Sequence, residues 1–169
     1  KVIEIYEGIK INYVIDIYAI FFKFIFLSIA LLSIISSFKL NFKFLDAYYG
    51  LILLMTLGMM IVSSSNDLIT LFVGLETAAI PAVILIAYER TKKGIQGAVE
   101  YLIYGAIFSS FLLLGMSLIY VSTGELNFDK ISDSLNNSAK ILLLLGVIMI
   151  FFGLAFEMSA APFHAWAPN

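Results

Sequence analysis

The chain has 169 residues, of which 62% are hydrophobic and only 13% charged, with a mean hydropathy of +1.01. Soluble domains have about 45–50% apolar and about 25% charged residues, so we expect an integral membrane protein. The sequence holds no cysteine, which excludes disulfides and thiolate metal ligands, and its net charge of −2 gives no basic footprint for nucleic acid. It starts with Lys rather than Met and stops in mid-pattern, so we expect a piece of a longer chain.

Five apolar runs are long enough to cross a bilayer, which needs about 20 helical residues for a core of about 30 Å. Residues 1–16, in contrast, mix polar and β-branched residues and are expected to form a short extended or hairpin segment outside the membrane. The Asn- and Ser-rich stretch 122–139 is expected to be a loop. The sequence therefore predicts an all-α, integral membrane, polytopic transmembrane helix bundle with spans at about 17–38, 47–62, 68–87, 95–121 and 141–161.

Basic residues indicate which side of the membrane each connection faces. The short connections 39–46 and 89–94 together carry five Lys or Arg residues, whereas the opposite side has four lysines spread among seven acids. The positive-inside rule then places 39–46 and 89–94 in the cytoplasm or its equivalent. This orientation requires an even number of spans before residue 17.

The third apolar run carries an acid near its middle. Glu76 would lie near the bilayer midplane, where an ionised acidic side chain costs about 2.5–3.5 kcal/mol on insertion scales. Pro81 follows five residues later and removes the hydrogen bond to the carbonyl of Thr77. A titratable group beside a freed backbone acceptor indicates proton transfer more than a structural role.

The same six-residue pattern recurs from Glu157 to Pro162, so both Pro81 and Pro162 are expected to mark helix breaks. Glu100, early in the fourth run, either joins the same proton path or simply faces the interface. Chains of Glu, His and Lys within spans are typical of proton relays.

Two further ionisable residues are candidates for this path. His164, the single histidine, follows the expected break and is either a relay or gating residue or a hydrogen-bonded interface residue. Lys23 lies about two turns into the first run, where it either snorkels to the interface or pairs with a buried carboxylate. No Gly-rich phosphate loop, metal-ligand cluster or Ser/His/Asp arrangement is present in the sequence.

Four stretches of the sequence resemble the antiporter-like, proton-pumping membrane subunits of respiratory complex I. The resemblance covers residues 13–169 and is strongest to the subunit N (subunit 2) family of NADH–quinone oxidoreductase. The stretches are Asn66–Glu76 with Pro81, Gly97–Leu102 with Ser109–Met116, Tyr120–Phe128, and Phe152–Glu157 followed by Pro162–Pro168.

This resemblance implies a fourteen-helix antiporter-like fold, of which these five spans would be the third to seventh, with the last helix broken at Pro162. It implies a proton-translocating membrane subunit of a complex I-type NADH (or other donor)–quinone oxidoreductase, in a prokaryotic plasma membrane or an organellar inner membrane. Redox energy would be released in partner subunits, which would handle quinone and the electron donor, and this chain would carry no cofactor and no metal.

By the same resemblance, Glu76 matches the family's glutamate of the input half-channel. Glu100 and Glu157, however, stand where the family usually has lysine. Two close carboxylates can share protons, or Lys23 can supply the missing positive charge.

The sequence is also consistent with two other functions. One is a related subunit of a cation/proton antiporter or of a membrane-bound hydrogenase. The other is a non-pumping structural membrane subunit, which the two acids in lysine positions would favour.

Overall fold

The computed structural model describes residues 13–39, 44–135 and 139–161. Its elements in chain order are α1 (Ile17–Ser36), the 3₁₀ turn η1 (Ser37–Lys39), α2 (Leu45–Val62), α3 (Leu68–Ile86), α4 (Lys92–Thr123), α5 (Phe128–Ser134) and α6 (Lys140–Glu157). Five of these helices, all except α5, are long and apolar enough to cross a membrane. The prediction of an all-α bundle with five spans is therefore confirmed. The chain divides into two compact units, Lys1–Gly94 and Ile95–Asn169.

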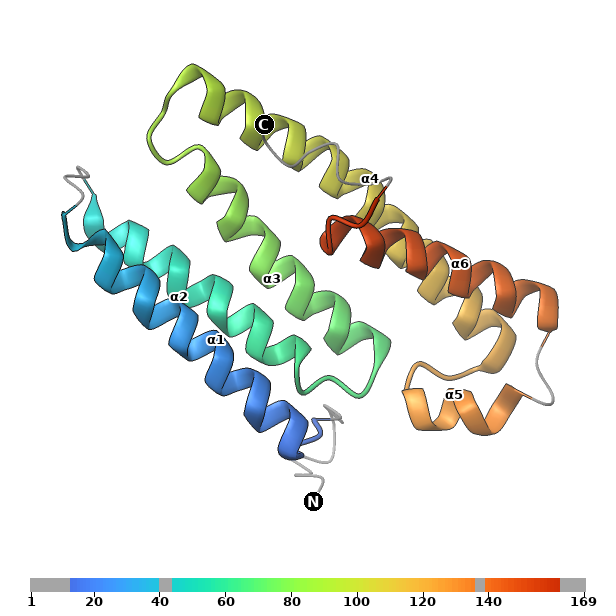
Figure 1. Cartoon of the computed structure of the whole chain (residues 1–169). Helices are drawn as coiled ribbons and strands as arrows, with labels where there is room; N and C mark the ends of the chain where they lie inside the picture. Colours follow the sequence, from blue (N-terminus) through green and yellow to red (C-terminus); the bar gives the residue numbers. More distant parts are fainter. Residues whose placement is uncertain (1–12, 40–43, 136–138, 162–169) are drawn as a thin grey trace. The chain divides into compact units, whose positions relative to one another are not determined.

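In the first unit, α1, α2 and α3 lie side by side and run in alternating directions (Figure 1). Two aspartates set the helix starts: Asp16 accepts from the amide of Ala19 at 2.7 Å, and Asp67 accepts from that of Thr70 at 2.8 Å. Each carboxylate satisfies a backbone N–H that has no partner within its own helix. Before α1, the amide of Val14 donates to the carbonyl of Ser64, which ties this part of the expected extramembrane segment to the α2–α3 turn.

Glycines allow α2 and α3 to approach at backbone distance. A Cβ added to Gly58 would lie 2.5 Å from the amide nitrogen of Ala78 and 2.7 Å from the carbonyl oxygen of Gly74. A Cβ added to Gly74 would in turn lie 2.8 Å from a methyl carbon of Val62. Since lipid gives helices little hydrophobic reason to associate, such close van der Waals packing is what holds membrane helices together.

In the second unit, α4 packs against α6 in the same manner, through Gly115, Gly146 and Gly153. At the end of α6, Phe156 is fully buried and stacks on Phe108 of α4, with ring centroids 4.6 Å apart and planes 12° apart. Phe108 is the seventeenth of the 32 residues of α4. The end of α6 therefore lies beside the middle of α4.

The connection between α4 and α6 differs from the predicted loop. It contains the short helix α5, whose second and third residues, Asp129 and Lys130, donate from their amides to the side chain of Asn127. Just before it, Gly124 adopts a left-handed backbone conformation with φ of 75°, and Lys130 forms an ion pair with Glu125 at 3.5 Å. A local cap and turn thus create a helix that the polar composition concealed.

Candidate functional site

Glu76 lies in the middle of a membrane-crossing helix, as the sequence predicts. It is the ninth of the 19 residues of α3 and is half-buried within the structure. Gly74 and Ala78, two residues to either side of it, are buried. The carboxylate is thus carried by a stretch of α3 that is packed closely on α2.

Pro81 does not break α3, which corrects the expected helix break at this residue. The helix runs continuously from Leu68 to Ile86, and Pro81 is fully buried within it. The missing amide still deprives the Thr77 carbonyl of its usual donor. A Cβ on Gly58 would lie 2.9 Å from the carbonyl carbon of Thr77, so α2 packs directly on this peptide group. The turn of α3 that precedes the proline is therefore covered by α2.

Glu100 lies two turns into α4, where it forms a hydrogen bond with Gln96. It is half-buried, and its Oε1 accepts a hydrogen bond from Nε2 of Gln96 at 2.8 Å. The helix starts at Lys92, earlier than predicted, because the hydroxyl of Thr91 accepts from the amide of Gly94 and caps it. Glu100 therefore lies about 12 Å along the helix from its first residue.

Glu157 is the last residue of α6, and a complete Schellman motif ends the helix there. The amide of Ala160 donates to the carbonyl of Ala155 at 2.8 Å, and that of Ser159 donates to the carbonyl of Phe156 at 2.9 Å. Ser159 adopts the left-handed conformation, with φ of 51°. These are the two bonds and the backbone conformation that define the motif. The helix thus ends four residues before the expected position, and Glu157 lies at its negative dipole end.

An aromatic cluster connects the neighbourhoods of Glu100 and Glu157. Tyr101, next to Glu100, lies with its ring centroid 5.9 Å from that of Phe156, next to Glu157. Both aromatic side chains are buried. The second unit therefore brings together the residues beside these two acids, whereas Glu76 belongs to the first unit.

Lys23 lies on the packed face of α1. It comes four residues after Ala19 and seven before Ala30, both buried, and it is itself half-buried. This position favours an inward-facing lysine over one that snorkels along a lipid-facing surface. Within the described part of the chain, the structure records no ion pair for Lys23, so its role as a charge partner stays a prediction. Pro162 and His164 lie outside the described residues.

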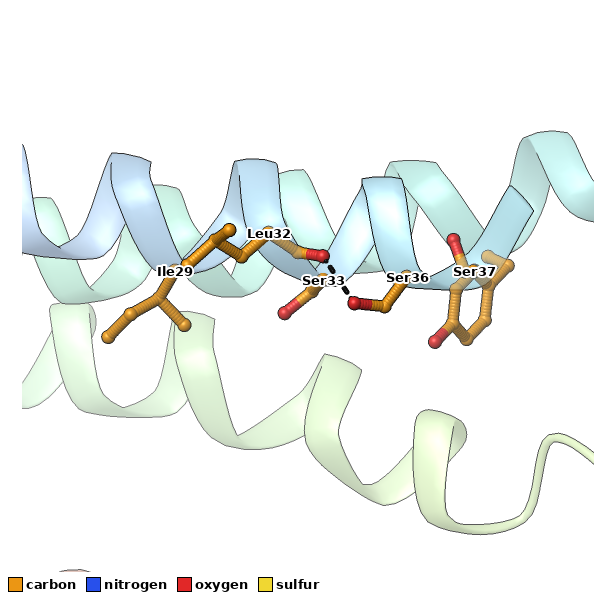
Figure 2. A pocket seen from close by; sticks show the side chains of 6 residues that line it. Ile29, Leu32, Ser33, Ser36 and Ser37 are labelled. Carbon is orange, nitrogen blue, oxygen red and sulfur yellow. Dashed lines mark hydrogen bonds between the residues drawn. The ribbon is translucent and has the colours of Figure 1, made fainter. Parts of the chain in front are cut away.

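An open surface pocket of about 390 Å³ lies along the second half of α1, where sequence reasoning predicted no site. Figure 2 shows Ser33, Ser36 and Ser37 along it, and Ile29, Leu32 and Tyr48 complete its lining. Ser36 and Ser37 donate their hydroxyl protons to the carbonyls of Leu32 and Ile34, at 2.8 and 2.7 Å. None of the predicted site residues that the structure describes lines this pocket.

Five membrane-crossing helices, with acids inside α3 and α4 and at the end of α6, define an integral, multi-pass membrane protein with ionisable groups in its spans. The model of one protein family, described as "NADH:quinone oxidoreductase/Mrp antiporter, TM", matches residues 65–169. The chain belongs to this family.

Curated relatives and solved structures agree with this assignment. The chain is 36% identical to NADH-quinone oxidoreductase subunit N of Desulforamulus reducens, over 96% of this chain and 36% of that protein. It is 40% identical to subunit N of Desulfitobacterium hafniense, over 93% and 32%. The chain thus spans about a third of the length of the curated relatives it matches.

Among solved structures, one match is to the membrane-bound sulfane sulfur reductase, an archaeal respiratory membrane complex. The TM-score is 0.88 at 34% identity, covering 99% of this chain and 36% of that one. Another is to respiratory complex I from Thermus thermophilus, with a TM-score of 0.73 at 28% identity, covering 92% and 35%. Both likenesses extend over nearly the whole chain.

Proposed function

We propose that this chain carries part of the proton path of a membrane subunit in a complex I-type oxidoreductase. Glu76, Glu100 and Glu157 are the acids that take up and release protons along this path, with His164 as a further relay residue. Electron transfer from NADH or another donor to quinone takes place in partner subunits, and we assign no redox cofactor to this chain. Residues 39–46 and 89–94 face the cytoplasm.

One observation carries this proposal: Glu76 lies at the centre of a span that packs at backbone distance on its neighbour. An ionisable group in the middle of a span is costly, and such groups mark ion or proton pathways. Five residues further on, Pro81 removes the amide that would bind the Thr77 carbonyl, which leaves an acceptor for water or a proton donor. The similarity to subunit N of several NADH-quinone oxidoreductases supports the same role.

Glu100 and Glu157 stand where the family usually has lysine, and this difference changes how protons can move along the path. With acids at positions 100 and 157, carboxylates that share protons replace a glutamate–lysine ion pair. Interacting carboxyl groups release their protons in steps that belong to the group as a whole. Alternatively, Lys23 on the packed face of α1 supplies the missing positive charge to Glu76, which belongs to the same unit.

The test is Glu76→Gln in the full-length protein within its assembled membrane complex, with protons translocated per electron as the measurement. The amide keeps the size of the side chain but cannot carry a proton, so we expect the ratio to fall while the complex still assembles. Glu89→Gln is the matched control, because Glu89 is exposed and lies between α3 and α4. An unchanged ratio in Glu76→Gln would contradict the proposal.

A second candidate is a related subunit in a complex with a different electron acceptor or in a cation/proton antiporter. Two observations favour keeping it: the higher TM-score to the sulfane sulfur reductase complex, and the family description that includes the Mrp antiporter. Purification of the native complex separates the candidates. Quinone-reducing partner subunits support the first candidate, whereas sulfur-reducing, hydrogenase or antiporter partners support the second.

A further inference from the structure

Gln96 forms a hydrogen bond with Glu100. Its Nε2 donates to Oε1 of Glu100 over 2.8 Å, from one helical turn earlier on α4. Residues four apart on a helix lie on the same face, so both partners are held by one rigid element. The contact therefore does not depend on how α4 packs against other helices.

A glutamine side chain can hydrogen-bond to a carboxyl group in either of its protonation states. Its amide has two N–H donors, which suit a carboxylate, and a carbonyl acceptor, which suits the O–H of a carboxylic acid. Rotation of the amide by about 180° exchanges its N–H donors and its carbonyl acceptor at the same position. A lysine offers donors alone and would suit only the charged form.

Among the described residues, the lysines of α4 lie further from Glu100 along the helix than Gln96 does. On α4, Lys93 precedes it by seven residues, about 10 Å along the axis, and Lys92 by eight. On α6, which packs against α4, the ionisable residues are Lys140 at its start and Glu157 at its end. Glu157 follows Phe156, whose ring centroid lies 5.9 Å from that of Tyr101, the neighbour of Glu100. Within the described residues, the side chain that hydrogen-bonds to Glu100 is thus neutral, and it orients the carboxyl group without fixing its charge.

We propose that Gln96 is a positioning residue for Glu100, which it holds in one orientation and hydrogen-bonds in both the charged and the neutral state. Glu100 then gains a proton from water or a neighbouring relay group and returns it, while Gln96 keeps its own protons and reverses its amide. This inference rests on the proposed role of Glu100 in the proton path. It goes beyond that role because it identifies the residue that allows Glu100 to alternate between its charged and neutral states.

The first test compares Gln96→Lys with Ile95→Lys in the full-length protein within its assembled complex. A lysine at position 96 holds Glu100 as a carboxylate, so we expect protons translocated per electron to fall to the level of Glu100→Gln. Ile95 is exposed like Gln96, but it lies five residues before Glu100 and therefore on a different face of α4. Ile95→Lys thus adds the same charge at nearly the same depth, directed away from Glu100, and should retain the wild-type ratio. In a Glu100→Gln background, Gln96→Lys should cause no further loss. An additional loss in that background would overturn the inference.

A second measurement follows the contact itself. The infrared carboxyl band of Glu100, identified by its disappearance in Glu100→Gln, should shift in Gln96→Met, which fills the same space without a hydrogen bond. An unchanged band in Gln96→Met would overturn the inference, whatever the proton ratio. An unchanged proton ratio in Glu100→Gln would instead contradict the proposed role of Glu100, while the band would still report on Gln96.

Discussion

Gly115 of α4 and Gly146 of α6 contact each other backbone to backbone. A Cβ on Gly115 would lie 2.7 Å from the carbonyl oxygen of Gly146, and a Cβ on Gly146 would lie 2.9 Å from that of Gly115. No side chain fits between the two helices at this point. The pair fixes the register that brings Phe156 onto Phe108 and places Glu157 beside the middle of α4.

Gly115→Ala should destabilise the protein, because the new methyl group meets backbone atoms that cannot move aside. Overpacking of this kind costs about 1–3 kcal/mol. Gly50→Ala is the control, since no heavy atom lies within 4 Å of its Cβ position, and it should be neutral or stabilising. Thermal unfolding of the purified complex in detergent measures both. Equal melting temperatures for the two variants would contradict the contact.

Ser159→Gly should stabilise the end of α6. Ser159 occupies the left-handed position of the Schellman motif, which is strained for a residue with a Cβ and usually held by glycine. The expected gain is up to about 1 kcal/mol, because the relief of strain is partly offset by the entropy of glycine in the unfolded chain. The same thermal assay applies, with Ser159→Val as the opposite change. A gain in Ser159→Val would show that the left-handed conformation is not adopted.

Glu157→Lys should be tolerated by the fold. A cation at a helix C-terminus is favoured by about 0.3–1 kcal/mol, so the end of α6 suits lysine better than glutamate. Val147→Lys, in the apolar and exposed middle of the same helix, should instead cost about 2.5–3.5 kcal/mol on insertion scales. Assembly yield and thermal stability report the difference. Equal losses in both variants would mean that Glu157 does not lie at a helix terminus.

Labelling with a membrane-impermeant maleimide tests the orientation. This sequence contains no cysteine, so Glu89→Cys and Asp129→Cys each add a single exposed thiol to it. Residue 89 precedes the start of α4 and residue 129 follows its end. We expect Glu89→Cys to react from the cytoplasmic side only, since it lies in a basic connection. Asp129→Cys should react from the other side. The reverse pattern would contradict the proposed topology.

The five spans and two helix starts could be predicted because each depends on local sequence. Apolar runs of sufficient length give the spans, and Asp67 precedes α3 in the order expected of a cap. Helix ends set by a side-chain cap or a backbone motif were harder to predict. The Thr91 cap, the Asn127 cap of α5 and the left-handed Ser159 all shifted a boundary without a change in hydrophobicity.

The candidate site also contains residues that could be predicted from the sequence and contacts that could not. Glu76 could be found from the sequence because an acid in the middle of a span is conspicuous at any position on the helix. Gln96 was missed because a polar residue near a helix start is common, although its spacing of four from Glu100 was a usable signal. The pairing of Gly115 with Gly146 depends on the register between α4 and α6, two helices that are distant in sequence. A single sequence does not specify this register.

The most direct test of the account is the number of protons translocated per electron by the assembled complex with Glu76→Gln, measured beside its electron-transfer rate. We predict that the ratio falls while Glu76→Asp, which keeps a titratable group, retains more of it. A ratio equal to that of the unaltered complex, with normal assembly, would show that Glu76 is not part of a proton path.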